Sequence, residues 1–263
     1  MKSPICALLG IEFPLVAFSH CRDVVAEVSR AGGMGVFGAG ALPPERLEEE
    51  LAWIDAHVDG KPYGVDLLIP EKMLGKHEDV NAAQALAALP ETHKAFADAV
   101  LARHGIDAGE LDAARDHMLQ IGRNLRPAGA ADLLAVAFKH PIKLIANALG
   151  VPPAIMLELG KRHGVPVAAL VGAREHAVKQ VAAGVDILVV AGSEAGGHCG
   201  EVSTLVLVPE VAEAIAGLRP VPILAAGGIV TGRQMAACMA LGAAGAWTRR
   251  CGSPRTKRKP IRL

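Results

Sequence analysis

The residue best suited to proton transfer in this sequence is His198, which lies inside the glycine-rich segment of residues 192–200. An imidazole changes charge near neutral pH, so it can take a proton from a substrate under physiological conditions. The alternative is a solvated surface histidine, which we expect for most of the ten histidines. Cys199 follows directly, but adjacent side chains rarely point at the same atom, so we expect no thiol chemistry there.

A phosphate group could be held by Gly227 and Gly228, which follow an apolar run at residues 222–226. Glycines allow backbone N–H groups to approach an anion closely, and a helix that begins just after them adds its positive N-terminal end. The alternative is an ordinary turn between a strand and a helix. We favour phosphate because this run is the seventh predicted strand, after which phosphate sites recur in barrel folds.

Asp66 is the third candidate, because it interrupts an apolar run at residues 65–69. A carboxylate among apolar residues needs a partner for its charge. It could contact a cofactor or a polar group of a neighbouring strand, or it could be a hydrogen-bonded structural residue. The sequence leaves these alternatives open.

Short apolar runs that alternate with helical stretches must position these residues. The expected strands are residues 13–18, 34–37, 63–69, 142–146, 165–171, 186–190, 222–226 and 243–247. The expected helices are residues 22–31, 44–58, 153–163, 174–183 and 232–241. Strands without polar alternation are typical of a parallel sheet covered by helices. We therefore predict an α/β fold, a (β/α)8 TIM barrel with its active site at the carboxyl ends of the strands.

The strand pattern disappears between residues 81 and 138, where we predict a helical insertion with helices at residues 92–104 and 112–122. This insertion either lies near the active-site face of the barrel or is a helical addition without a role in the site. The predicted division is a barrel over residues 1–248 and a tail over residues 249–263, so that the barrel is truncated after strand eight.

The formal net charge of zero hides an asymmetry, because residues 249–263 hold seven basic residues and no acidic one. The other 248 residues carry 20 basic and 27 acidic groups, a net charge of −7. A basic tail without aromatic residues supports only non-specific attraction to phosphates, so we expect no specific nucleic-acid partner. We also expect no membrane span and no signal peptide. The five cysteines lack metal-ligand spacing, which indicates free thiols, no metal site and a cytoplasmic location.

Six short motifs together resemble one known family. They are Gly-Ile-Glu-Phe-Pro at residues 10–14, Arg-Ala-Gly-Gly-Met-Gly at 30–35, Tyr-Gly-Val-Asp-Leu-Leu at 63–68, Glu-Ala-Gly-Gly-His at 194–198, Ala-Ala-Gly-Gly-Ile at 225–229 and Ala-Leu-Gly-Ala at 240–243. Over residues 11–248 the sequence resembles the nitronate monooxygenases. The resemblance implies a TIM barrel that binds FMN and oxidises alkyl nitronates or nitroalkanes with O2, without a nicotinamide.

The resemblance also implies roles for single residues. His198 would be the general base that takes a proton from the carbon bearing the nitro group. The implied FMN contacts are Ala17, Phe18 and Ser19 along the ring, Asp66, Gly196 in the loop on the flavin side, and Ala226, Gly227 and Gly228 at the phosphate. Asp66 stands where the family usually has asparagine, Ala191 where many members have glutamine, and Arg249–Arg250 where the family has Gly-Ser or Gly-Thr.

The tail suggests a reading-frame hypothesis, because the resemblance ends at Thr248. Codons can be assigned to residues 250–263 so that a reading shifted by two bases gives Val-Trp-Leu-Thr-Glu-Asp-Glu-Ala, close to the family's continuation. We hypothesise that the tail is out of frame, which predicts weak FMN retention. A nucleotide sequence in which no shifted frame restores a Trp-Leu-Thr-like continuation would reject the hypothesis.

Two other functions stay open from the sequence. An FMN-dependent enoyl reductase would consume NAD(P)H, and an inactive truncated barrel would bind a phosphate-bearing ligand or nothing. The physiological substrate and the oligomeric state are not determined by the sequence.

Overall fold

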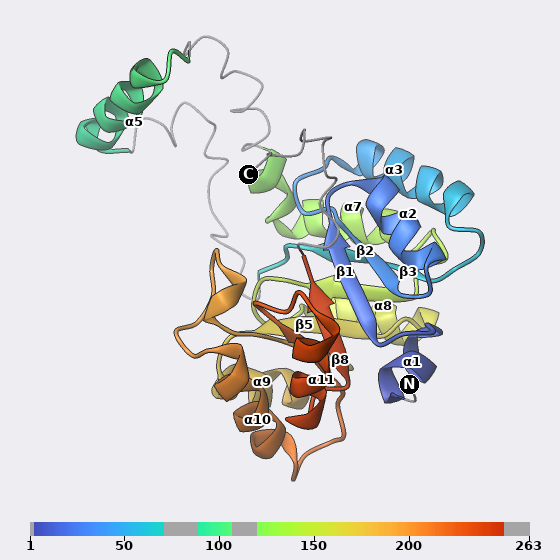
Figure 1. Ribbon diagram of the computed structural model, residues 1–263. Helices are drawn as coiled ribbons and strands as arrows, with labels where there is room; N and C mark the ends of the chain where they lie inside the picture. The colour runs from blue at the N-terminus through green and yellow to red at the C-terminus, as the bar shows by residue number, and fades with distance from the viewer. Residues whose placement is uncertain (1–2, 71–88, 107–119, 250–263) are drawn as a thin grey trace, which may run out of the picture.

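The fold is a closed barrel of eight parallel strands, which pair in chain order and close through β8 against β1. The computed structural model describes residues 3–70, 89–106 and 120–249, and Figure 1 shows the barrel with its surrounding helices. The strands are β1 (Leu15–Ser19), β2 (Met34–Gly38), β3 (Tyr63–Leu67), β4 (Leu144–Asn147), β5 (Val167–Val171), β6 (Ile187–Ala191), β7 (Ile223–Ala226) and β8 (Gly245–Thr248). The predicted TIM barrel is confirmed, and each strand overlaps the apolar run that predicted it.

Helices follow most of the strands. They are α1 (Pro4–Leu9), α2 (Arg22–Arg30), α3 (Pro44–His57), α5 (Glu91–Arg103), α7 (Pro127–Ala137), α8 (Ala154–His163), α9 (Arg174–Ala183), α10 (Thr204–Ile215) and α11 (Gly232–Ala240). The five helices predicted between the strands are present with ends shifted by one residue at most.

Both faces of the strands are buried, which explains the runs without alternation. Leu144 packs with Val16 and Met34 inside the barrel, whereas its neighbour Ile145 packs with Val65 under the helices. Each fully buried side chain of this size contributes about 1.5–3 kcal/mol of hydrophobic stabilisation. The lumen is therefore a packed core that leaves room for a ligand only at its ends.

Three helices were not predicted individually: α7, which lies within the predicted helical insertion, and α1 and α10. In α1, the Ser3 side chain accepts a hydrogen bond from Ile5 N and Pro4 occupies the first turn, a start signal that the sequence carries. In α10, Pro209 lies inside the helix, where proline normally argues against one. Burial of the apolar face of α10 outweighs that cost.

The connection between β3 and β4 is longer than the others. Its helix α5, at the place predicted for residues 92–104, has no buried residue and stands away from the barrel in Figure 1. Most of the helix predicted at residues 112–122 lies outside the described residues. Asn124 Nδ2 donates to Gly40 O at 3.0 Å and to Leu42 O at 2.7 Å, which fastens this connection to the loop after β2. The chain then enters α7, which packs against α3.

The tail at residues 250–263 also lies outside the described residues. Within the described ranges, no helix is long and apolar enough to cross a bilayer. No cluster of three or more potential metal ligands occurs in that part of the chain either.

Candidate active site

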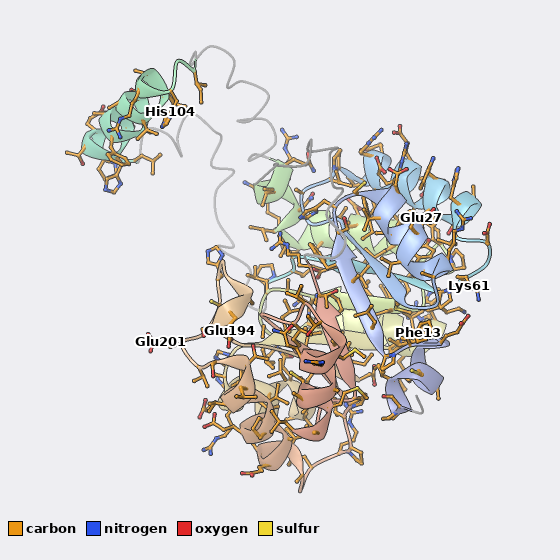
Figure 2. The ribbon with its side chains drawn as sticks, viewed as in Figure 1. Phe13, Glu27, Lys61, His104, Glu194 and Glu201 are labelled. Carbon is orange, nitrogen blue, oxygen red and sulfur yellow. The ribbon has the colours of Figure 1, made fainter. Side chains whose placement is uncertain are left out.

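The candidate residues gather at one end of the barrel. All but Ala17, the middle residue of β1, lie in the last two residues of a strand or in the loop after it. Since all strands are parallel, these positions share the carboxyl end. Figure 2 shows Glu194, in the loop after β6, on the opposite side of the view from Phe13 and Lys61, which precede their strands. A hollow lined by Glu27, Arg30, Ala31, Asp59 and Lys61 lies at that other end and has no part in the site.

The loop after β6 carries His198. A single 3₁₀ turn, η2 (Ser193–Ala195), leads into it, and Gly196 and Gly197 follow with φ of +72° and +68°. These left-handed conformations favour glycine, and they leave His198 exposed. Cys199 Sγ lies 3.4 Å from Ser193 O, so the thiol turns back to its own loop. His198 therefore remains the candidate for proton transfer in this loop.

Thr204, the first residue of α10, ties this loop to the glycine pair. Its backbone N–H donates to Glu194 Oε2 at 2.8 Å, and its hydroxyl lies 3.0 Å from the same oxygen. The hydroxyl also lies 3.0 Å from Ala226 O and 3.1 Å from Gly227 O. The bond from the Thr204 N–H, with smaller contributions, holds the pKa of Glu194 below its ordinary value. Glu194 is therefore an anion that caps the N-terminus of α10.

We expect Thr204→Val to lower the free energy of unfolding by about 1–3 kcal/mol, because it removes the hydroxyl and leaves its oxygen partners without that contact. Valine keeps the volume of the side chain. Thr204→Ser, which keeps the hydroxyl, should retain most of the stability in the same urea titration. Equal unfolding midpoints for the two variants would show that the hydroxyl does not connect the loops.

Gly227 and Gly228 form the turn after β7, with φ of +101° and +68°. A Cβ at position 227 would lie 2.7 Å from Thr204 Oγ1 and 3.0 Å from Ala195 N, so this turn requires glycine. At the start of α11, the Thr231 N–H already donates to Gln234 Oε1 at 2.9 Å, so this N–H is not available to an anion. In the described part of the chain, the N–H groups of the two glycines have no such partner, so they are available to an anion.

Asp66 faces the lumen near the carboxyl end of β3. Two residues earlier, a Cβ on Gly64 would lie 2.9 Å from Leu144 Cβ and 3.3 Å from Val36 Cγ2, both inside the barrel. Alternation along the strand directs Asp66 to the same side. Its side-chain Oδ1 is buried without a hydrogen-bond partner, so the structural hydrogen bond considered from the sequence is not formed at this atom.

The end of β1 lies beside the end of β8. Phe18 packs on the lumen cluster, while alternation turns Ala17 to the other face of the strand. Ser19 Oγ accepts a hydrogen bond from Cys21 N at 3.0 Å. Arg249, directly after β8, places its guanidinium carbon 5.1 Å from the centre of the Phe18 ring, a cation–π contact. A positive group thus stands at the mouth of the barrel.

The structure adds residues that the sequence did not assign to the site. Glu194 and Thr204 hold the two candidate loops together, and the sequence signal for them is Ser203–Thr204 before an apolar helical run. Asn147 accepts from Ile69 N at 2.9 Å, which fixes the segment just beyond β3. The Ser203–Thr204 signal predicts the start of a helix, whereas the contacts that these residues make are seen only in the fold.

Comparison with known proteins identifies the family. A model described as nitronate monooxygenase matches residues 2–248. The chain belongs to the nitronate monooxygenase family. A protein of Mycobacterium tuberculosis, provisionally named a monooxygenase, is 53% identical to this chain over 254 residues. The matched region covers 96% of this chain and 66% of the relative.

Two solved structures are similar to this member of the nitronate monooxygenase family. Nitroalkane oxidase from Streptomyces ansochromogenes has a TM-score of 0.71 and 26% identity, with 94% of this chain and 67% of that chain covered. A variant of FabK from Thermotoga maritima has a TM-score of 0.66 and 26% identity, with coverage of 95% and 65%. The chain therefore spans about two-thirds of the length of its relatives.

Proposed function

We propose that this chain is a flavin-dependent oxidoreductase that binds FMN and uses O2 to oxidise alkyl nitronates, or nitroalkanes after proton removal. The observation that carries the proposal is the placement of His198 and the glycine pair after the adjacent strands β6 and β7. In a member of the nitronate monooxygenase family, this adjacency supports a base, His198, that would work next to a phosphate-binding turn, Gly227–Gly228.

The residues at the barrel mouth fit FMN. The N–H groups of Gly227 and Gly228 would hold its phosphate, and the positive charge of Arg249 would favour the anion. Ala226, at the end of β7, would contact the ligand with its methyl group. Gly38 allows Phe18 and His20 to pack against β2, since a Cβ there would lie 2.5 Å from Phe18 Cζ and 2.7 Å from His20 Cε1. Phe18, Ser19, Asp66 and Gly196 complete the proposed contacts.

His198 would perform the proton transfer. Its neutral imidazole would accept a proton from the substrate carbon that bears the nitro group, which converts the nitroalkane into the nitronate. Exposure of His198 allows this proton to pass to solvent. Bound FMN would supply the electron acceptor and the chemistry with O2, so the protein itself binds, orients and deprotonates.

An absorption spectrum of the purified protein, followed by O2 consumption with propionate 3-nitronate, tests the proposal. We expect a flavin spectrum and O2 uptake that depends on the nitronate. Rapid bleaching of the flavin by NADH without O2 would instead favour an enoyl reductase. Absence of both flavin and uptake, including after FMN is added, would favour an inactive barrel.

A further inference from the structure

Asp66 lies where an anion has little to stabilise it. The strand register places it between Gly38 on β2 and Ala146 on β4, neither of which has a polar side chain. The residue is 7% exposed, and its Oδ1 lacks a hydrogen-bond partner. Burial of a carboxylate without hydrogen bonds is costly, and a carboxyl group in this position gains by keeping its proton.

The groups around Asp66 do not remove this cost. Arg249 attracts the carboxylate from the end of β8, but its guanidinium lies over the Phe18 ring. His20, after β1, lies on the lumen side of Gly38, 2.7 Å from where a Cβ would be, but its Nδ1 contact, at 2.9 Å, is with Gly38 O. β4 contributes no titratable side chain. Burial therefore dominates: it raises the pKa of Asp66 from 3.8 to about 8, and Arg249 lowers it only in part.

The buried carboxyl group also points toward the region in which we place the flavin. A carboxylic acid is a hydrogen-bond donor, whereas a carboxylate is only an acceptor. The ring system of a flavin offers carbonyl oxygens and unprotonated ring nitrogens, which are acceptors. A neutral Asp66 is therefore complementary to such a ligand, and an ionised Asp66 would repel its acceptor atoms.

We propose that Asp66 is a neutral carboxylic acid in the folded protein near neutral pH, and that its O–H donates a hydrogen bond to an acceptor atom of the bound flavin ring. The second half rests on the proposed FMN site, whereas the first half is a property of the protein alone. The affinity for flavin would then depend on whether the carboxyl group of Asp66 carries its proton.

The protonation of Asp66 can be measured without flavin. Infrared difference spectra between the wild-type protein and Asp66→Asn at pH 7 should contain the carbonyl band of a protonated carboxyl group, which should fade as the pH rises through about 8. A carboxylate band in its place at pH 7 would overturn the proposal. Asparagine has nearly the same shape and cannot ionise, so it is the matched control.

The stability of the protein gives a second measure that does not need flavin. The folded protein keeps a proton that the unfolded chain releases, so the stabilisation from Asp66 is complete at low pH and is lost as the pH rises from about 3.8 to about 8. The urea midpoint of the wild type should fall relative to that of Asp66→Asn over this range. A constant difference between the midpoints would contradict a proton held by Asp66.

The donor role is tested by FMN titrations between pH 7 and 9.5, followed by quenching of flavin fluorescence. Because the phosphate of FMN, with a second pKa of about 6, is already about 90% doubly ionised at pH 7, its charge changes little in this range. The wild-type dissociation constant should rise above pH 8 by up to about tenfold per unit, whereas that of Asp66→Asn should stay flat. Arg249→Gln should move the rise to higher pH, because the lost positive charge had lowered the pKa of Asp66.

The outcomes separate this proposal from the proposed function. Parallel pH profiles in the wild type and Asp66→Asn, with FMN bound by both, would overturn the donor role and leave the proposed function intact. Failure of both proteins to bind FMN at any pH would overturn the proposed function and the donor role together. The infrared band would still decide whether Asp66 is neutral.

Discussion

Replacing His198 with asparagine is expected to lower turnover of neutral nitroalkanes by about 10²–10⁴-fold, the usual contribution of a general base. Oxidation of preformed nitronates should change far less, because their carbon has already lost its proton. O2 consumption with each substrate form, normalised to bound flavin, measures the two effects. The result follows from the exposed position of His198 at the barrel mouth.

His176→Asn is the matched control, since this histidine lies on the exposed side of α9. It should leave both activities unchanged. An equal loss of both activities in His198→Asn, at equal flavin content, would contradict the base role and indicate a role in binding or orientation.

The Gly227→Ala variant is expected to lose FMN affinity by at least about tenfold, together with about 1–3 kcal/mol of stability, the cost of a strained backbone. At φ of +101° an alanine is strained, and its Cβ would approach Thr204 Oγ1 to 2.7 Å. The turn must shift, which moves the N–H groups that we assign to the phosphate. Fluorescence titration with FMN and urea unfolding measure the two losses.

Gly232→Ala provides the comparison on the same segment. Gly232 begins α11, and no other atom lies within 4 Å of the Cβ that would be added. Its affinity for FMN should match that of the wild type, and its stability should not fall. Normal FMN affinity in Gly227→Ala would mean that the phosphate is held elsewhere.

The barrel could be predicted from the sequence because its strands are locally encoded. Runs such as residues 187–190 are apolar on both faces, and glycines such as Gly184, with φ of +100°, end the helices before the next strand. The position of His198 and the glycine pair after their strands follows from the same pattern. The family resemblance then supplies roles that no spacing alone determines.

The connections within the site could not be predicted in this way. The Thr204 contacts with Glu194 and Ala226 join segments that are distant in the chain, and they depend on how α10 packs against β6 and β7. The isolation of Asp66 likewise depends on the register that sets it beside Gly38 and Ala146. A local pattern identifies an unusual aspartate, but only the packing shows that its charge is unmatched.

Closure of the barrel also sets an order for folding. β1 pairs with β8 through Leu15 and Ala246, which lie near opposite ends of the described chain. Contacts between such distant residues form slowly, because a long loop must close before they contribute any stability. During synthesis, β1 therefore keeps one unpaired edge until β8 has been made, and this edge is open to pairing with other chains. We expect aggregation during expression to depend on how quickly the last strand follows the first.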